Sequence, residues 1–290
     1  MTVDVFGVFA QAVINGLLIG GVYASLSIGL ALVWGVMDIV NFAHAGFMIL
    51  ACFLYYFMLS LFGFDPMVSL VLTLPFFFII GAAIYKLLIV RLRRPELMSL
   101  IVTFGVVAIL EGSMSSLWGN EPKALATSYS MSSFTFGGLV IRSSYLLGFL
   151  LSLIMMLSLN SLLKSTLIGK GIRATAQSRE AATIIGINTG TVTLLTFSLG
   201  VATAAVAAVP MALSFSFYPG AYLHWTLTMF LIVALGGLGG VFGTFFASLV
   251  IGLVQSTMTA FFPIEWADVV AFTLLVIILV IRPKGLFGEL

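Results

Sequence analysis

Long apolar runs alternate along the chain with short polar connections. A helix needs about 20 predominantly apolar residues to cross the hydrocarbon core of a bilayer. The pattern therefore predicts membrane spans at residues 9–34, 39–62, 66–90, 97–118, 145–163, 191–217 and 269–281. The first run is longer than the apolar core of a cleavable signal, so we expect it to be the first span itself. A polar stretch at residues 119–144 separates the fourth and fifth spans.

Residues 226–262 form one apolar run that is too long for a single span. Its glycine-rich stretch, Gly236 to Gly243, is where we expect a break, because glycine tolerates non-helical backbone. Such backbone occurs at membrane depth only when it packs within protein or lines a cavity. Either an even number of crossings or one crossing plus a re-entrant half-helix fits this region. We thus predict one all-α domain, residues 1–290, a polytopic bundle of about eight spans plus one short or broken helix.

Basic residues gather in three connections. Membrane proteins carry an excess of Lys and Arg on cytoplasmic loops, so all three clusters are expected in the cytoplasm. Counting crossings from them places the N-terminus outside and the C-terminus in the cytoplasm, with residues 119–144 as an external loop. The clustered residues are Lys86, Arg91, Arg93 and Arg94; Lys164, Lys170, Arg173 and Arg179; and Arg282 and Lys284.

Composition agrees with a membrane protein. Hydrophobic residues make up 61% of the chain and charged residues only 8%, against roughly 25% charged in a soluble domain. With a net charge of +2 and no basic tract, nucleic acid is not an expected ligand. The single cysteine, Cys52, excludes an internal disulfide. No Cys, Asp or Glu lies at ligand spacing beside His44, so no metal site is expected.

The connection at residues 164–188 is the longest polar segment on the expected cytoplasmic side. Its pattern predicts a short helix at residues 172–185, between Gly171 and Gly186 as start and stop signals. Small residues beside charges on such a helix can press closely against a groove of another protein. A solvated connecting loop is the alternative.

Four motifs in this order resemble the permeases of branched-chain amino acid ABC importers (the LivH type). The first is MDIVNFAHAGFMIL at residues 37–50, and the second is G-x-R-A-x-A followed by A-A-x-x-x-G-I-N at residues 171–188. The third is YPGAY followed by ALGGLGGVFG at residues 234–243, and the fourth is IRPKGLFG at residues 281–288. Three departures concern the cargo more than the family: Ala45 between His44 and Gly46, Ser178 at a commonly acidic position, and Met229 near a position where lysine is common.

The resemblance implies a transport subunit of a bacterial inner membrane that is not itself an enzyme. Besides the membrane lipid that surrounds the subunit, the resemblance implies four kinds of partner: a second permease, either a paralogue or a copy of this chain, two ATP-binding cassette ATPases, a periplasmic substrate-binding protein and the amino acid cargo. No cofactor is expected on this chain, with ATP bound by the ATPases. Gly169-Lys170 lacks the flanking residues of a phosphate-binding loop. The residues expected to couple to the ATPases are Gly171, Arg173, Ala174, Arg179, Glu180, Ala182 and Gly186.

Helix breaks at corresponding positions of two halves often mark a translocation pathway. Residues 37–46 and 236–243 form such a pair here. Asn41 and His44 are three residues apart and would share a helix face, either lining the pathway or bonding to neighbouring backbone. Glu111 lies well inside a span, so it either meets a substrate ammonium or bonds to another helix. The pathway candidates are Asn41, His44, Glu111, Gly236, Gly237, Gly239 and Gly240.

Two other functions compete with this interpretation. An ion-coupled secondary transporter would carry acidic or histidine relays within its spans, and only Glu111 and His44 qualify. A membrane hydrolase would need a metal cluster or a Ser/His/Asp set, yet His44 and His224 are the only histidines. Within the family, an importer of urea or of aromatic acids remains an alternative to one of branched-chain amino acids.

Overall fold

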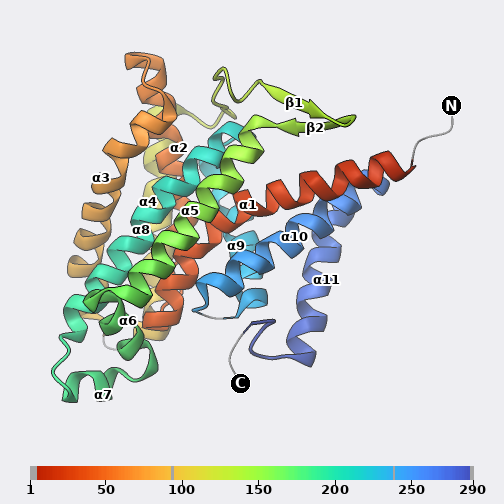
Figure 1. Cartoon of the computed structure of the whole chain (residues 1–290). Coiled ribbons are helices and arrows are strands. Elements are labelled where there is room, and N and C mark those ends of the chain that lie inside the picture. Colours follow the sequence, from red (N-terminus) through yellow and green to blue (C-terminus); the bar gives the residue numbers. More distant parts are fainter. Residues whose placement is uncertain (1–4, 93–94, 238, 288–290) are drawn as a thin grey trace.

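The computed structural model describes residues 5–92, 95–237 and 239–287, and these form a helical bundle with one small hairpin (Figure 1). The nine long helices are α1 (Val5–Met37), α2 (Ala43–Phe62), α3 (Pro66–Leu87), α4 (Pro95–Trp118), α5 (Ser143–Ser165), α8 (Thr189–Ser214), α9 (Tyr222–Gly236), α10 (Val241–Phe261) and α11 (Glu265–Ile281). The short elements are η1 (Ile89–Arg91), β1 (Ser133–Phe136), β2 (Leu139–Arg142), α6 (Leu167–Gln177), α7 (Arg179–Ile184) and η2 (Pro219–Ala221).

The long helices run between two ends of the bundle (Figure 1). The hairpin end carries β1 and β2, and the opposite end, which we call the basic end, carries α6 and α7. Within the described residues, eight helices are long and apolar enough to cross a membrane. One of the eight spans, Pro219–Gly236, joins η2 and α9 and has 18 residues, so α11 with 17 residues is shorter than every one of these spans. The predicted polytopic helical bundle is thus confirmed.

The long first helix occupies the centre of the bundle, and glycines let its neighbours approach closely. A side chain on Gly16 would meet the backbone of Leu253, and one on Gly20 would meet that of Leu249. From the other side, a side chain on Gly252 would meet the backbone of Gly16 and Gly20. Small residues spaced four apart allow this kind of contact between membrane helices, where packing rather than hydrophobic burial drives association. Gly16, Gly20 and Gly252 therefore hold α10 closely against α1.

The glycine-rich stretch breaks the long apolar run as expected. Helix α9 ends at Gly236 and α10 begins at Val241. Gly237 and Gly239 have φ angles of 91° and 85°, a backbone conformation that residues other than glycine rarely adopt. At 15 residues, α9 is about 22 Å long, shorter than a typical span. It begins four residues earlier than the predicted span because Pro219 starts the preceding turn.

The polar stretch between α4 and α5 contains a hairpin that the hydrophobic pattern did not predict. Strands β1 and β2 are antiparallel, with Phe136 opposite Leu139. Gly137 and Gly138 form the two-residue turn, and both have positive φ angles, as the tightest hairpin turns require. Farther along the chain, Phe217 forms an isolated bridge with Lys123, which explains why α8 ends at Ser214 and not at residue 217.

The prediction of one helix at residues 172–185 is wrong. Ser178 has an extended backbone that divides the segment into α6 and α7. Its hydroxyl accepts a hydrogen bond from the Ala181 amide at 3.2 Å and so caps α7. Serine competes with helical hydrogen bonding in this way and favours the first position of a helix over its interior.

Candidate functional site

The connection between α1 and α2 is the first of the two breaks expected along the pathway. Asp38 has a φ angle of 51°, which is uncommon for a residue other than glycine. The buried Asn41 precedes α2, where its side-chain oxygen accepts a hydrogen bond from the Ala43 amide at 3.1 Å. The expectation that Asn41 and His44 share the face of one helix is therefore wrong, because Asn41 lies before the first residue of the helix that contains His44.

His44 lies buried inside the bundle. Its side chain is 1% exposed. A Cβ atom built on Gly29 of α1 would lie 3.0 Å from the His44 Cε1 atom and would clash with the Thr203 hydroxyl of α8. The imidazole is thus packed where α1, α2 and α8 meet, and any movement of these three helices would displace it.

The two breaks meet around the last turns of α1. The Phe230 ring of α9 lies 5.5 Å from the Trp34 ring and 5.1 Å from the Phe42 ring, measured between ring centres. A side chain on Gly35 would clash with the backbone of Gly239. Segments about 200 residues apart in sequence thus lie side by side at the basic end. The structure brings the predicted pair of breaks together.

The C-terminal tail packs onto the second break. The Leu286 amide donates a hydrogen bond to the Leu235 carbonyl at 2.8 Å. Gly285 has a φ angle of 83°, and a Cβ atom there would lie 2.7 Å from both the Ala234 carbonyl oxygen and the Gly237 nitrogen. Two of the recognised motifs, the glycine-rich stretch and the tail, are therefore in contact. Sequence spacing carried no signal for this contact.

Glu111 lies apart from these residues. Thr103 of α4 accepts a hydrogen bond from the Phe42 amide at 3.1 Å, which ties α4 to the first break. Glu111 is eight residues further along α4, or roughly 12 Å toward the hairpin end. There its half-buried carboxylate lies against Gly220 and interacts with Tyr222. The structure therefore separates Glu111 from Asn41, His44 and the glycines of the second break.

The predicted coupling residues all lie on or beside α6 and α7, at the basic end, but they divide into two groups. Arg173, Arg179 and Glu180 are exposed. Gly171 packs against Val192 of α8, and Ala182 is 2% exposed. The first group is available to a partner, whereas the second holds α6 and α7 in place. Ala174 is half-buried, and Gly186 has a φ angle of 88° just past the end of α7.

Sequence reasoning missed two exposed apolar residues in this segment. Ile184 and Ile185 are 85% and 73% exposed at the C-terminal end of α7. The sequence pattern places both in one predicted helix at residues 172–185 and gives them no role. Since the segment is instead split at Ser178, both side chains project from the tip of the basic end. Together they form an exposed apolar surface of the kind that protein interaction sites contain.

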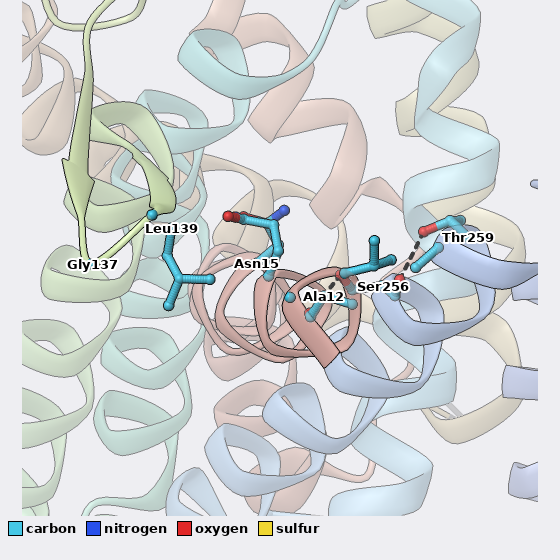
Figure 2. A pocket seen from close by; sticks show the side chains of 11 residues that line it. Ala12, Asn15, Gly137, Leu139, Ser256 and Thr259 are labelled. Atoms are coloured by element: carbon cyan, nitrogen blue, oxygen red, sulfur yellow. Dashed lines mark hydrogen bonds between the residues drawn. The ribbon is translucent and has the colours of Figure 1, made fainter. Parts of the chain in front are cut away.

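A groove of about 610 Å³ opens at the hairpin end (Figure 2). Its sides are α1, the hairpin turn and the last turns of α10, represented by Asn15, Gly137 and Thr259. Ser256 of α10 closes part of its floor by donating a hydrogen bond to the Ala12 carbonyl at 2.8 Å. Its polar lining consists of amides and hydroxyls. No residue proposed for the pathway lines this groove.

The sequence of this chain is similar to those of known proteins. Residues 12–279 match the family model described as "Branched-chain amino acid transport system / permease component". The chain is 28% identical to the high-affinity branched-chain amino acid transport system permease protein BraD of Pseudomonas aeruginosa, across 97% of this chain and 96% of that one. It is 30% identical to LivH of Salmonella typhimurium and 29% identical to LivH of Escherichia coli, with the same coverage. No solved structure matches the chain.

Proposed function

From the premise that this chain belongs to the family of LivH-type branched-chain amino acid permease components, we propose a specific transport mechanism for it. The chain is a multi-pass membrane subunit of a binding-protein-dependent ABC importer. It moves branched-chain or related amino acids inward by ATP-driven alternating access. Its relatives are named as high-affinity permeases for these amino acids, which supports the cargo class.

One observation carries the proposed mechanism: both helix breaks and the α6–α7 segment lie at the same end of the bundle. The breaks meet at Trp34 and Gly35, and α6 also packs against α1. A push on α6 and α7 therefore reaches α1 directly and, through α1, both breaks. Interfaces between packed helices switch between discrete arrangements rather than deforming continuously.

The proposed orientation places the basic end in the cytoplasm. Lys86, Lys164, Lys170 and Arg282 lie toward this end, with α6 and α7, as the positive-inside rule requires of cytoplasmic connections. Arg93 and Arg94 lie outside the described residues. In this orientation the ATPases, which bind the ATP, contact α6 and α7, and the binding protein delivers cargo at the hairpin end. The membrane is then the bacterial inner membrane.

Within this proposal the pathway residues have different roles. Asn41, His44, Gly236, Gly237, Gly239 and Gly240 form the mobile cytoplasmic side of the pathway. Glu111, nearer the hairpin end, is available to a substrate ammonium before that side opens. A second permease, either a paralogue or another copy of this chain, completes the pathway.

Reconstitution into proteoliposomes tests the proposal. The chain is assembled with the permease and ATPases encoded beside it, with ATP inside the vesicle and binding protein outside. Uptake of labelled leucine should require both, and unlabelled valine should compete better than urea or phenylalanine. Uptake that follows a proton or sodium gradient without ATP would instead favour a secondary transporter. Competition by urea or an aromatic acid would reassign the cargo within the family.

A further inference from the structure

We propose that the basic end carries a binding site for the headgroup of an anionic phospholipid, built from the C-terminal tail and the adjoining ends of α5 and α10. The site combines three exposed phenylalanine rings with three cations. The rings belong to Phe242, Phe246 and Phe287, and the cations to Lys164, Arg282 and Lys284. This inference does not depend on which solute the protein transports.

The aromatic part of the site is continuous. Phe242 and Phe246 are one turn apart on α10 and therefore share a face of that helix. The Phe287 ring of the tail lies 5.9 Å from the Phe246 ring, and its Cβ atom would lie 3.0 Å from a side chain on Gly243. The exposed fractions of the three side chains are 40%, 46% and 53%. Packed together yet open on one side, these rings offer an apolar surface that acyl chains can cover.

One cation contacts this surface, and two more lie on the tail that carries Phe287. The Lys164 ammonium lies 5.7 Å from the centre of the Phe242 ring, at the last turn of α5. Contact with a ring leaves the ammonium hydrogens available to further acceptors. Arg282 and Lys284 are exposed on the tail, where the Gly285 amide donates a hydrogen bond to the Arg282 carbonyl at 2.9 Å and closes a turn. Among the described side chains, no carboxylate forms an ion pair with any of these three cations.

Position within the bundle identifies the partner as a lipid. Phe242 and Phe246 lie in the first two turns of a membrane-spanning helix, within about 8 Å of its end along the helix axis. An exposed ring at that depth faces hydrocarbon, whereas the neighbouring cations reach the level of the headgroups. Basic side chains between helices at this boundary bind anionic headgroups, each contributing through charge complementarity. A soluble protein partner could reach the cations and Phe287 but not Phe242 and Phe246, which lie within the span.

A lipid held here would act on the second break. The same tail that contributes Phe287 and Lys284 bonds to Leu235 and packs against Gly237. A headgroup that joins Lys164 to Lys284 would therefore fasten α5, α10 and the tail to one another. It would restrict the separation of α9 from α10 and favour the arrangement seen here.

The test measures the unfolding temperature of the full-length protein in neutral detergent with short-chain phosphatidylglycerol or phosphatidylcholine. Phosphatidylglycerol should raise it by roughly 3–6 °C, and phosphatidylcholine should have little effect. The double variant Lys164→Gln/Lys284→Gln should bind phosphatidylglycerol about thirtyfold more weakly. The control Lys86→Gln/Arg91→Gln removes two exposed cations from another part of the basic end and should respond as the wild type does. Native mass spectrometry counts retained phosphatidylglycerol as an independent measure.

Three results would overturn the proposal. The first is equal stabilisation by both lipids, or by glycerol phosphate without acyl chains. The second is an unchanged phosphatidylglycerol response in the Lys164→Gln/Lys284→Gln variant. The third is loss of co-purifying ATPase from that variant while its lipid response persists, which would make this surface a protein interface.

Discussion

Gln11 and Val140 are joined by two hydrogen bonds between one side chain and one backbone unit. The Gln11 amide group donates to the Val140 carbonyl at 2.7 Å and accepts from the Val140 amide at 2.8 Å. One side chain of α1 thus satisfies both backbone groups of a residue in β2, as a neighbouring strand would. A two-stranded hairpin is marginally stable by itself in water. Gln11 therefore attaches the hairpin to the helix that reaches both breaks.

Replacing Gln11 with alanine should loosen the hairpin while leaving the bundle intact. Both bonds are solvent-exposed, so water replaces them at a cost of about 1 kcal/mol. Hydrogen exchange at the Val140 amide should accelerate on the order of fivefold to tenfold. Gln255→Ala is the control, because its single side-chain bond, to Asp268, lies elsewhere. Unchanged exchange at Val140 in Gln11→Ala would show that the hairpin is held by other contacts.

Gly35→Ala should separate the end of α1 from the second break. The added methyl group would occupy the position of the Gly239 backbone, so one of the two segments must move. Overpacking of this kind costs about 1–3 kcal/mol and should lower both the unfolding temperature and the rate of uptake. Gly112→Ala is the matched control, since a methyl group on Gly112 meets no other atom within 4 Å. It should leave uptake unchanged and stabilise α4 by up to about 1 kcal/mol. Normal uptake by Gly35→Ala would remove this contact from the mechanism.

The membrane helices were predictable because hydrocarbon demands long apolar runs, and the break at Gly236 to Gly240 because glycine clusters there. The hairpin was not, since its strands are four residues each and one of its stabilising partners, Gln11, lies far away in sequence. The division of α6 from α7 rests on one capping hydroxyl, that of Ser178. A serine inside a helical pattern reads equally as helix interior or as cap, and only tertiary packing decides.

The candidate site shows the same limit. Sequence placed Asn41 and His44 in one helix because their spacing suits one, but the left-handed Asp38 turns the chain before α2 begins. The hydrogen bond between Leu286 of the tail and Leu235 joins residues 51 positions apart in the chain, and the periodicity of the sequence does not predict such a contact. The sequence identified the candidate residues, but only the packed structure shows which of them lie together.

Ile184→Asp/Ile185→Asp should uncouple transport from ATP without disturbing the fold. Both side chains are exposed, so charge there costs little stability but removes the apolar surface proposed to meet the ATPases. Protein level in the membrane should match the wild type, and ATP-driven uptake should fall at least tenfold. Ile184→Val/Ile185→Val keeps the apolar surface and should retain uptake. Full uptake by the aspartate variant would exclude this tip from coupling.

Ala182→Glu should also reduce uptake, but by destabilising α7 rather than by removing a contact with the ATPases. Ala182 is buried, so a glutamate there either displaces α7 or buries an unpaired charge. We expect a loss of several kcal/mol of local stability and reduced protein in the membrane. Limited proteolysis of residues 164–188 distinguishes this outcome from uncoupling. Cleavage as slow as in the wild type would contradict the assignment of Ala182 to a structural role.

Stability at the hairpin end should fall in alkaline solution because of Tyr129. Its hydroxyl donates a hydrogen bond to the Asp65 carboxylate at 2.7 Å, and that carboxylate also caps α3 by accepting from the Met67 amide. Partial burial, and then the neighbouring Asp65, raise the pKa of the Tyr129 phenol above its ordinary value of about 10. The folded chain therefore keeps this proton at a pH where the unfolded chain has lost it. The resulting stabilisation is complete below pH 10 and disappears as the pH rises through the higher, folded-state pKa.

Tyr129→Phe isolates this contribution from those of other tyrosines. At pH 7 the variant should be less stable than the wild type by about 1 kcal/mol, the value of a partly exposed hydrogen bond to a charged group. Because only the wild type loses stability through this phenol, the difference in unfolding temperature should shrink steadily above pH 10. A difference that stays constant up to pH 11.5 would mean that the bond to Asp65 does not control the ionisation of Tyr129. Asp65→Asn keeps an acceptor for the Met67 amide and so should preserve the cap of α3. It should weaken the alkaline loss of stability without abolishing it, because burial continues to raise the pKa of the Tyr129 phenol.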